Sequence, residues 1–203
     1  MDRKLLLVGL SAAVLLAGMA LGTVLFSRAS ELRGAAYAEP YPVAADFELT
    51  RSDGTLFRLS EMQGRVVLLF FGYTACPDVC PTALAELKLV LEEFGHDQAE
   101  DVQVVFVTVD PARDDPTRVQ EYVNHFNAGF IGLSGMEPDL AKIWNEYGIF
   151  RETVNDASAA GYQINHTARV TLIDRRGRLR VSFAFDATVD DIVHDVKLIL
   201  KQD

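Results

Sequence analysis

The sequence has little cysteine, no excess of basic residues and no internal repeat. Only two cysteines occur among its 203 residues, and both lie far from the apolar run at the amino terminus, which excludes a lipoprotein anchor. The formal net charge of −10 argues against nucleic acid or an anionic lipid surface as a partner. Without repeats or low-complexity tracts, the length fits one domain with a substantial core plus a targeting segment.

An uncharged run from Leu5 to Phe26 predicts a membrane-spanning helix. Its length matches the roughly 20 residues that a bilayer span requires, and Arg3 and Lys4 precede it. A cleaved secretory signal is the alternative, because Ala36-Tyr37-Ala38 resembles a cleavage site, although it lies well beyond the run.

The basic amino terminus should stay in the cytoplasm and place the rest of the chain outside it, in an oxidising compartment. We therefore expect a single-pass anchor in a bacterial inner membrane over residues 1–28. A linker is expected over 29–45, followed by a domain over 46–203 on the periplasmic side.

The stretch from Arg65 to Leu84 organises the rest of the chain, and it reads RVVLLFFGYTACPDVCPTAL. The continuous apolar run Val66–Phe71 predicts a strand that is buried on both faces, as in a parallel sheet. A helix is predicted over Pro81–Phe94. The two cysteines thus lie where the sheet delivers the chain to solvent, which is where ligands bind in open α/β sheets.

The remaining elements follow from periodicity and turn residues. Asp115 is expected to cap a helix that begins at Pro116, and Phe150–Tyr162 is expected to form a surface excursion or a short hairpin. The other predicted elements are a hairpin over Phe47–Leu59, strands Val102–Val109 and Phe130–Leu133, a helix from Glu137 to Tyr147, a hairpin over Val170–Phe185 and a helix over Val189–Leu200. This order predicts a thioredoxin-like α/β fold, a mixed sheet flanked by helices, preceded by the transmembrane helix.

Cys76 and Cys80 are four residues apart and would face each other at the start of a helix. That spacing suits a disulfide and equally suits two ligands on one metal ion. A small structural disulfide or a pair of inert thiols is the simpler interpretation, but closing so short a loop adds little stability. Because thioredoxins have two residues between the thiols rather than three, the wider loop leaves more room for a metal.

His166 is the candidate third ligand, because thiolates and imidazole together are a copper or zinc set. It lies immediately before the penultimate strand, in a loop that faces the dithiol in thioredoxin-like sheets and usually carries a cis-proline there. The other histidines, His96, His125 and His194, are expected to be surface or packing residues.

Three segments together resemble the Sco (SenC) family of thioredoxin-fold copper chaperones for cytochrome c oxidase assembly. They are FGYTACPDVCPTAL, VTVDPARDDP and INHTARVTLID, and the resemblance extends from about Asp46 to the end of the chain. It implies that Cys76, Cys80 and His166 bind one copper, as Cu(I) or Cu(II). It also implies delivery to, or redox preparation of, the dinuclear copper site of oxidase subunit II, with a copper donor protein and a thiol reductant as further partners. Thr171 departs from the family, which often has an aromatic residue in that strand.

Two carboxylates are candidates for indirect roles at the site. Asp78 lies between the cysteines and would hydrogen-bond near the site or serve only as a turn acceptor. Asp110 ends the neighbouring strand and would orient a ligand or contact a partner, or serve only as a turn or cap residue.

Three other functions compete with a copper chaperone that binds and transfers metal rather than turning over substrate. A thiol–disulfide oxidoreductase would use the same dithiol, Cys76 and Cys80, without His166, to keep oxidase cysteines reduced. A peroxiredoxin-like peroxidase would use the VCPT segment, but Pro77 stands where such enzymes place threonine. A structural zinc site would lack the usual fourth ligand.

Overall fold

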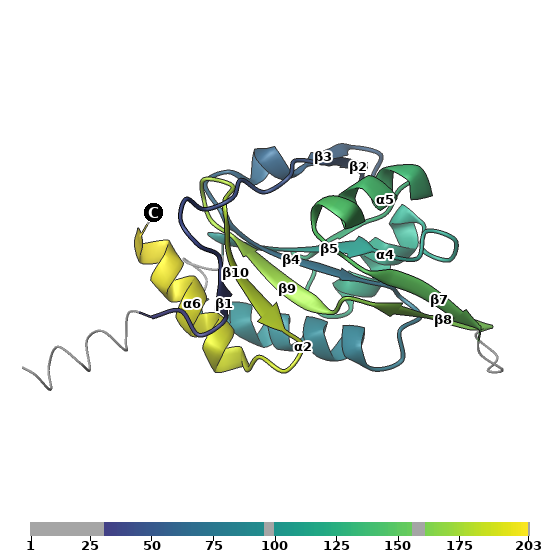
Figure 1. Ribbon diagram of the computed structural model, residues 1–203. Coiled ribbons are helices and arrows are strands. Elements are labelled where there is room, and N and C mark those ends of the chain that lie inside the picture. The colour runs from purple at the N-terminus through teal and green to yellow at the C-terminus, as the bar shows by residue number, and fades with distance from the viewer. Residues whose placement is uncertain (1–30, 96–99, 156–160, 203) are drawn as a thin grey trace, which may run out of the picture. The chain divides into compact units, whose positions relative to one another are not determined.

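The computed structural model describes residues 31–95, 100–155 and 161–202 (Figure 1). The chain divides into two compact units, Met1–Leu32 and Arg33–Asp203, and the second contains the sheet and helices described below. The predicted anchor over 1–28 lies outside the described residues. Within those residues, no helix combines the length and apolarity that a membrane crossing needs.

A mixed sheet forms the centre of the second unit, and in the described part of the chain its strand order is β1-β10-β9-β4-β5-β6. Strand β4 runs parallel to β5 and antiparallel to β9. All residues of β4 and β5 are buried, as their continuous Val, Leu and Phe runs predict for strands covered on both faces. The strands are β1 (Ala35–Ala36), β4 (Val66–Gly72), β5 (Val102–Thr108), β6 (Ile131–Leu133), β9 (Arg169–Ile173) and β10 (Leu179–Ala184).

Helices cover both faces of this sheet (Figure 1). Helices α2 and α4 connect the parallel strands β4, β5 and β6 in one direction, so right-handed crossovers put both on the same face. Helix α6 packs against α2 on that face, and α5 lies on the other. The helices are α2 (Val79–Glu92), α4 (Pro116–Asn124), α5 (Glu137–Glu146) and α6 (Val189–Gln202).

Alternate side chains of β4 fill the two halves of the core. Phe70 packs against Phe106 of β5, with ring centroids 5.8 Å apart. Phe71 points to the opposite face and meets the Tyr147 ring at the end of α5, at 5.6 Å. These side chains hold the end of β4 in place just before the cysteines.

The predicted turns and caps of the domain are confirmed at two places. The first hairpin consists of β2 (Glu48–Thr50) and β3 (Leu56–Arg58), followed by the 3-10 helix η1 (Leu59–Met62). Asp115 caps α4 by accepting a hydrogen bond from the Arg118 N–H at 2.8 Å, with Pro116 as the first helical residue.

The region expected to be an excursion or short hairpin forms a two-stranded antiparallel sheet. Its strands are β7 (Arg151–Asn155) and β8 (Tyr162–His166), and Arg151 pairs with His166. The sequence had predicted that His166 lies in a loop. It is instead the last residue of strand β8. Its position before β9 is as expected.

The second compact unit begins at Arg33 and so includes part of the segment 29–45 that was predicted to be a linker. The N–H groups of Arg33 and Gly34 donate to the buried Asp195 carboxylate of α6, at 2.9 Å each. Ala35 of β1 then pairs with Ser182 of β10. The sequence gives no local sign of these contacts because their partners lie about 150 residues away.

Candidate metal centre

The two cysteines lie at the junction between β4 and α2. Cys80 is in the first turn of α2 and is fully buried, whereas Cys76 is partly exposed in the loop before it. Both are free thiols, and the Cys80 N–H donates to Cys76 Sγ at 3.4 Å. The arrangement presents one thiol to solvent and keeps the other behind it.

The environment favours a thiolate at Cys76. The Cys80 thiol, by donating to Cys76 Sγ, is the main cause that lowers the pKa of Cys76 to about 5. Burial opposes this effect, while the N–H groups of Asp78 and Cys80 add to it. The same hydrogen bond, together with burial, raises the pKa of Cys80 well above its usual value. The proton of the pair therefore stays on Cys80, and Cys76 is the thiolate.

His166 presents an unprotonated nitrogen toward the dithiol. Its Nδ1 lies 3.1 Å from the Thr167 carbonyl oxygen, which can only accept, so Nδ1 carries the proton. Nε2 lies 3.9 Å from Cys80 Sγ. Burial lowers the pKa of His166, so the imidazole is neutral and its Nε2 lone pair is free to bind a metal.

These donors fit a soft metal ion. Thiolate and imidazole ligands bind at about 2.3 and 2.0 Å in zinc proteins, so donors 3.9 Å apart are close enough to share one ion. Within the described ranges, however, no three His, Cys, Asp or Glu side chains already form a closed metal-binding group. A three-ligand site would need Cys76, the more exposed thiol, to turn toward the other two donors.

Tyr73 joins the two parts of the site, a role that sequence analysis missed. Its hydroxyl accepts a hydrogen bond from the Ile164 N–H of β8 at 3.4 Å. Its ring meets the His166 ring edge-on at 5.8 Å. Burial raises the pKa of Tyr73, so the phenol stays neutral. A cleft of about 470 Å³ opens here between the cysteine loop and β8.

Asp114 binds the start of the cysteine loop through Thr74, and sequence analysis also missed this role. Its buried carboxylate accepts from the Thr74 N–H at 2.9 Å, from the Thr74 hydroxyl at 2.5 Å and from the Thr108 hydroxyl at 2.7 Å. Thr74 lies two residues before Cys76, so Asp114 fixes the start of the dithiol loop. Only the VTVDPARDDP segment pointed to this region.

Asp110 is fully buried two residues beyond the end of β5, and it contacts the β7–β8 sheet rather than the thiols. It pairs with Arg113 and accepts a hydrogen bond from the Tyr162 hydroxyl at 2.8 Å. Asp78 is exposed, and its side chain makes no capping bond to α2, although its N–H faces Cys76. The indirect roles proposed for these two carboxylates stay predictions.

The other histidines lie away from the dithiol or outside the described residues. His125 follows the last turn of α4 as its C-cap. His194 lies in α6, with Nδ1 2.9 Å from the Asp195 carboxylate. His96 falls outside the described residues.

Comparison with known proteins agrees with this geometry. A profile of the SCO1/SenC family matches residues 35–201. The SCO2-like protein of Rickettsia felis is 33% identical over 162 residues, which cover 79% of this chain and 78% of the relative.

Two solved structures share the fold. Apo Sco1 of Thermus thermophilus is 37% identical, with a TM-score of 0.73 over 82% of this chain and 96% of its own. Bradyrhizobium japonicum ScoI, solved with copper bound, is 35% identical, with a TM-score of 0.70 over 77% of this chain and 99% of its own.

The fold and the site together define a thioredoxin-like domain, a mixed sheet with helices whose dithiol lies beside a histidine. The chain belongs to the SCO1/SenC family. The sequence-based prediction of that family is confirmed.

Proposed function

We propose that this protein is a membrane-anchored copper metallochaperone in which Cys76, Cys80 and His166 bind one copper ion. Family membership and the copper held by the ScoI structure support this function. The observation that carries it is the 3.9 Å separation of Cys80 Sγ and His166 Nε2, with Nδ1 held by a backbone carbonyl.

The donor set suits copper in both oxidation states. Soft thiolates favour Cu(I), and the imidazole makes Cu(II) tolerable. Before copper arrives, Cys76 is already a thiolate and His166 is neutral, whereas Cys80 keeps its proton. Binding would therefore release about one proton per copper at neutral pH, from Cys80 Sγ to solvent.

The protein would deliver copper to the dinuclear copper site of cytochrome c oxidase subunit II, or would prepare that site by reducing its cysteines. A copper donor protein and a thiol reductant would supply the metal and keep the dithiol open. The anchor would hold the domain on the periplasmic face of a bacterial inner membrane. Protease added to intact spheroplasts would test this placement, because it should digest the domain without lysis.

The decisive experiment is an anaerobic Cu(I) titration of the reduced full chain in nonionic detergent, against a competing chelator. We expect one tightly held copper per chain and loss of affinity in His166→Ala. The matched control is His125→Ala, an exposed histidine at the end of α4. If the wild type binds no copper, or His166→Ala binds as tightly as the control, His166 is not a ligand.

A thiol–disulfide oxidoreductase is the second candidate, and the unequal exposure of the two thiols favours it. Cys76 Sγ is accessible, with the buried Cys80 in contact behind it. The Cys76 thiolate would attack a substrate disulfide and form a mixed disulfide, releasing the first substrate thiol. Cys80 would then attack Cys76 Sγ and release the second substrate thiol. The domain would then be oxidised to a disulfide and the substrate reduced to two thiols.

Reduction of glutathione disulfide separates the two functions. If the protein is an oxidoreductase, His166→Ala should reduce glutathione disulfide at the wild-type rate, and Cys76→Ser should not reduce it. Slow reduction by the wild type, together with tight copper binding, would exclude this second candidate.

A further inference from the structure

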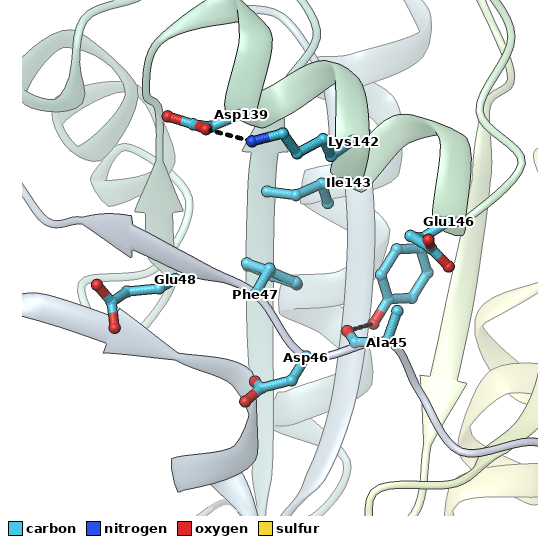
Figure 2. Close-up of a pocket in the computed structure, with 9 residues that line it drawn as sticks. Ala45, Asp46, Phe47, Glu48, Asp139, Lys142, Ile143 and Glu146 are labelled. Carbon is cyan, nitrogen blue, oxygen red and sulfur yellow. Dashed lines mark hydrogen bonds and ion pairs between the residues drawn. The ribbon is translucent and has the colours of Figure 1, made fainter.

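A second groove, of about 210 Å³, lies between the segment that enters β2 and helix α5 (Figure 2). None of its lining residues lines the cleft at Cys76. Its volume is below the roughly 300–1,000 Å³ of small-molecule pockets. The groove therefore suits one or two side chains of a peptide rather than a cofactor.

The floor of the groove is apolar. Phe47, beside β2, and Ile143, from α5, approach from opposite sides, as Figure 2 shows. Tyr147 also lines the groove, and its hydroxyl donates to the Ala45 carbonyl at 2.7 Å, so this polar group is already satisfied. What the floor presents to a ligand is aromatic and aliphatic carbon.

The rim is acidic, and its charges are only partly balanced. Glu48 pairs with Arg58 at 2.5 Å, and Asp139 pairs with Lys142 at 3.0 Å. In the described ranges, Asp46 and Glu146 form no ion pair, although both are exposed. The Asp46 carboxylate accepts one hydrogen bond, from the Ser60 N–H at 2.9 Å, and keeps its negative charge.

Asp46 and Glu146 lie at the same end of the groove, beside Tyr147. Asp46 follows Ala45, whose carbonyl accepts the hydrogen bond of the Tyr147 hydroxyl, and Glu146 directly precedes Tyr147. Burial is the main cause that raises the pKa of Tyr147, and the charges of Asp46 and Glu146 add to it. The groove combines an apolar floor with two carboxylates that have no ion-pair partner among the described residues.

We propose that this groove is a docking site for a basic segment of a partner protein. An aliphatic side chain of the segment would enter between Phe47 and Ile143. A lysine or arginine next to it would lie against Asp46 and Glu146. Charge complementarity selects this occupant, because an acidic segment would meet like charges at the same end of the groove.

The inference does not depend on which chemistry the dithiol performs. Because the groove and the Cys76 cleft share no lining residue, a partner seated in the groove leaves Cys76 open. Docking there would raise the effective concentration of the partner near the dithiol without covering it.

A fluorescein-labelled peptide, acetyl-Lys-Leu-Lys-Leu-Lys-amide, would test the proposal by fluorescence anisotropy with the full chain in nonionic detergent, corrected for empty micelles. We expect the Asp46→Lys, Glu146→Lys double variant to bind at least about tenfold more weakly, since two modest attractions become repulsions. The double variant Glu121→Lys, Asp186→Lys has the same change in charge on other exposed surfaces and should differ from wild type by less than about threefold. An unchanged rate of Cys76 alkylation would show that each variant is folded.

A second probe with serine in place of both leucines separates the floor from the rim, and it should bind at least about tenfold more weakly than the leucine peptide. Equal binding of the serine and leucine peptides would overturn the proposal, because the apolar floor would then contribute nothing. Equal weakening by the two double variants would also overturn it, because net charge rather than the groove would then govern binding.

Discussion

The two halves of the candidate metal centre are held in different ways. The dithiol follows β4, a central strand whose residues are all buried. His166 ends β8 in a two-stranded sheet, where Ile164 is the only buried residue among the described positions of both strands. One half is built on the core of the domain, and the other is attached to its surface.

The attachment of the β7–β8 sheet is polar and localised. The Arg113 guanidinium lies 3.7 Å from the centre of the Tyr162 ring and donates to the Tyr162 carbonyl at 3.0 Å. On the other strand, Arg151 donates to the Val109 carbonyl at 2.5 Å. Sheets with few buried contacts open at lower free energy than the core. We therefore expect the distance between His166 and the thiols to change without unfolding of the central sheet.

Asp114→Asn should cause the largest loss of stability, since it acts on the half built on the core. An amide cannot accept from all three donors of Thr74 and Thr108 that now bond to the buried carboxylate. We expect the free energy of unfolding to fall by about 3 kcal/mol in urea titrations.

Asp115→Asn, at the next position, is the matched control. Asparagine is as good a helix cap as aspartate, so the change should be small. Equal stability of the two variants would mean that Asp114 does not support the dithiol loop.

Gly72→Ala tests how tightly the same half is packed. A Cβ at this position would lie 2.8 Å from Cys80 Sγ and 2.7 Å from the Phe106 ring. Overpacking of this kind costs about 2 kcal/mol. Gly129→Ala, whose Cβ would meet only the Asn127 side chain at 3.2 Å, should be nearly neutral. Thermal unfolding of both variants would measure the difference, and a fully stable Gly72→Ala would show that the thiol has room to move.

Alkylation of Cys76 compares the two halves directly. The pKa of Cys76 is lowered, so its thiolate persists above about pH 5 and the rate falls as the pH drops through that value. Cys80→Ala removes the main cause and should slow alkylation at pH 6 by at least about tenfold. His166→Ala removes only a minor charge effect and should change the rate by less than about threefold.

Iodoacetamide labelling followed by mass spectrometry would give these rates across pH. The opposite order, with His166→Ala the slower variant, would show that the histidine rather than the core half activates the thiol.

The core half was predictable from the sequence because its signals are local. Continuous apolar runs predicted β4 and β5, and the spacing of Cys76 and Cys80 at the end of β4 indicated a dithiol site. The β7–β8 sheet lacks such a signal, since polar residues on both faces leave strand register weakly specified.

The supporting contacts were missed for a related reason. Tyr73 contacts Ile164, and Asp114 contacts Thr74, each at least 40 residues away in the sequence. Burial of a carboxylate or phenol cannot be inferred from neighbours in the chain. His166 was proposed as a ligand from its residue type and from its place immediately before the penultimate strand, and its role as a ligand stays a prediction.

Tyr162→Phe should cause the smallest loss of stability, and the loss should be confined to the β7–β8 sheet that carries His166. It removes the hydrogen bond to Asp110, worth about 1 kcal/mol, and keeps the ring under Arg113. Tyr122→Phe is the control, because within the described residues the buried Tyr122 hydroxyl has no hydrogen-bond partner and its loss should be neutral.

Hydrogen exchange followed by NMR gives a readout for each half. In Tyr162→Phe, we expect the Ile164 amide of β8 to exchange about fivefold faster while amides of β4 are unchanged, because the lost bond anchors only the β7–β8 sheet. Equal acceleration in both strands would mean that the two halves open as one unit, and the contrast between them would then fail.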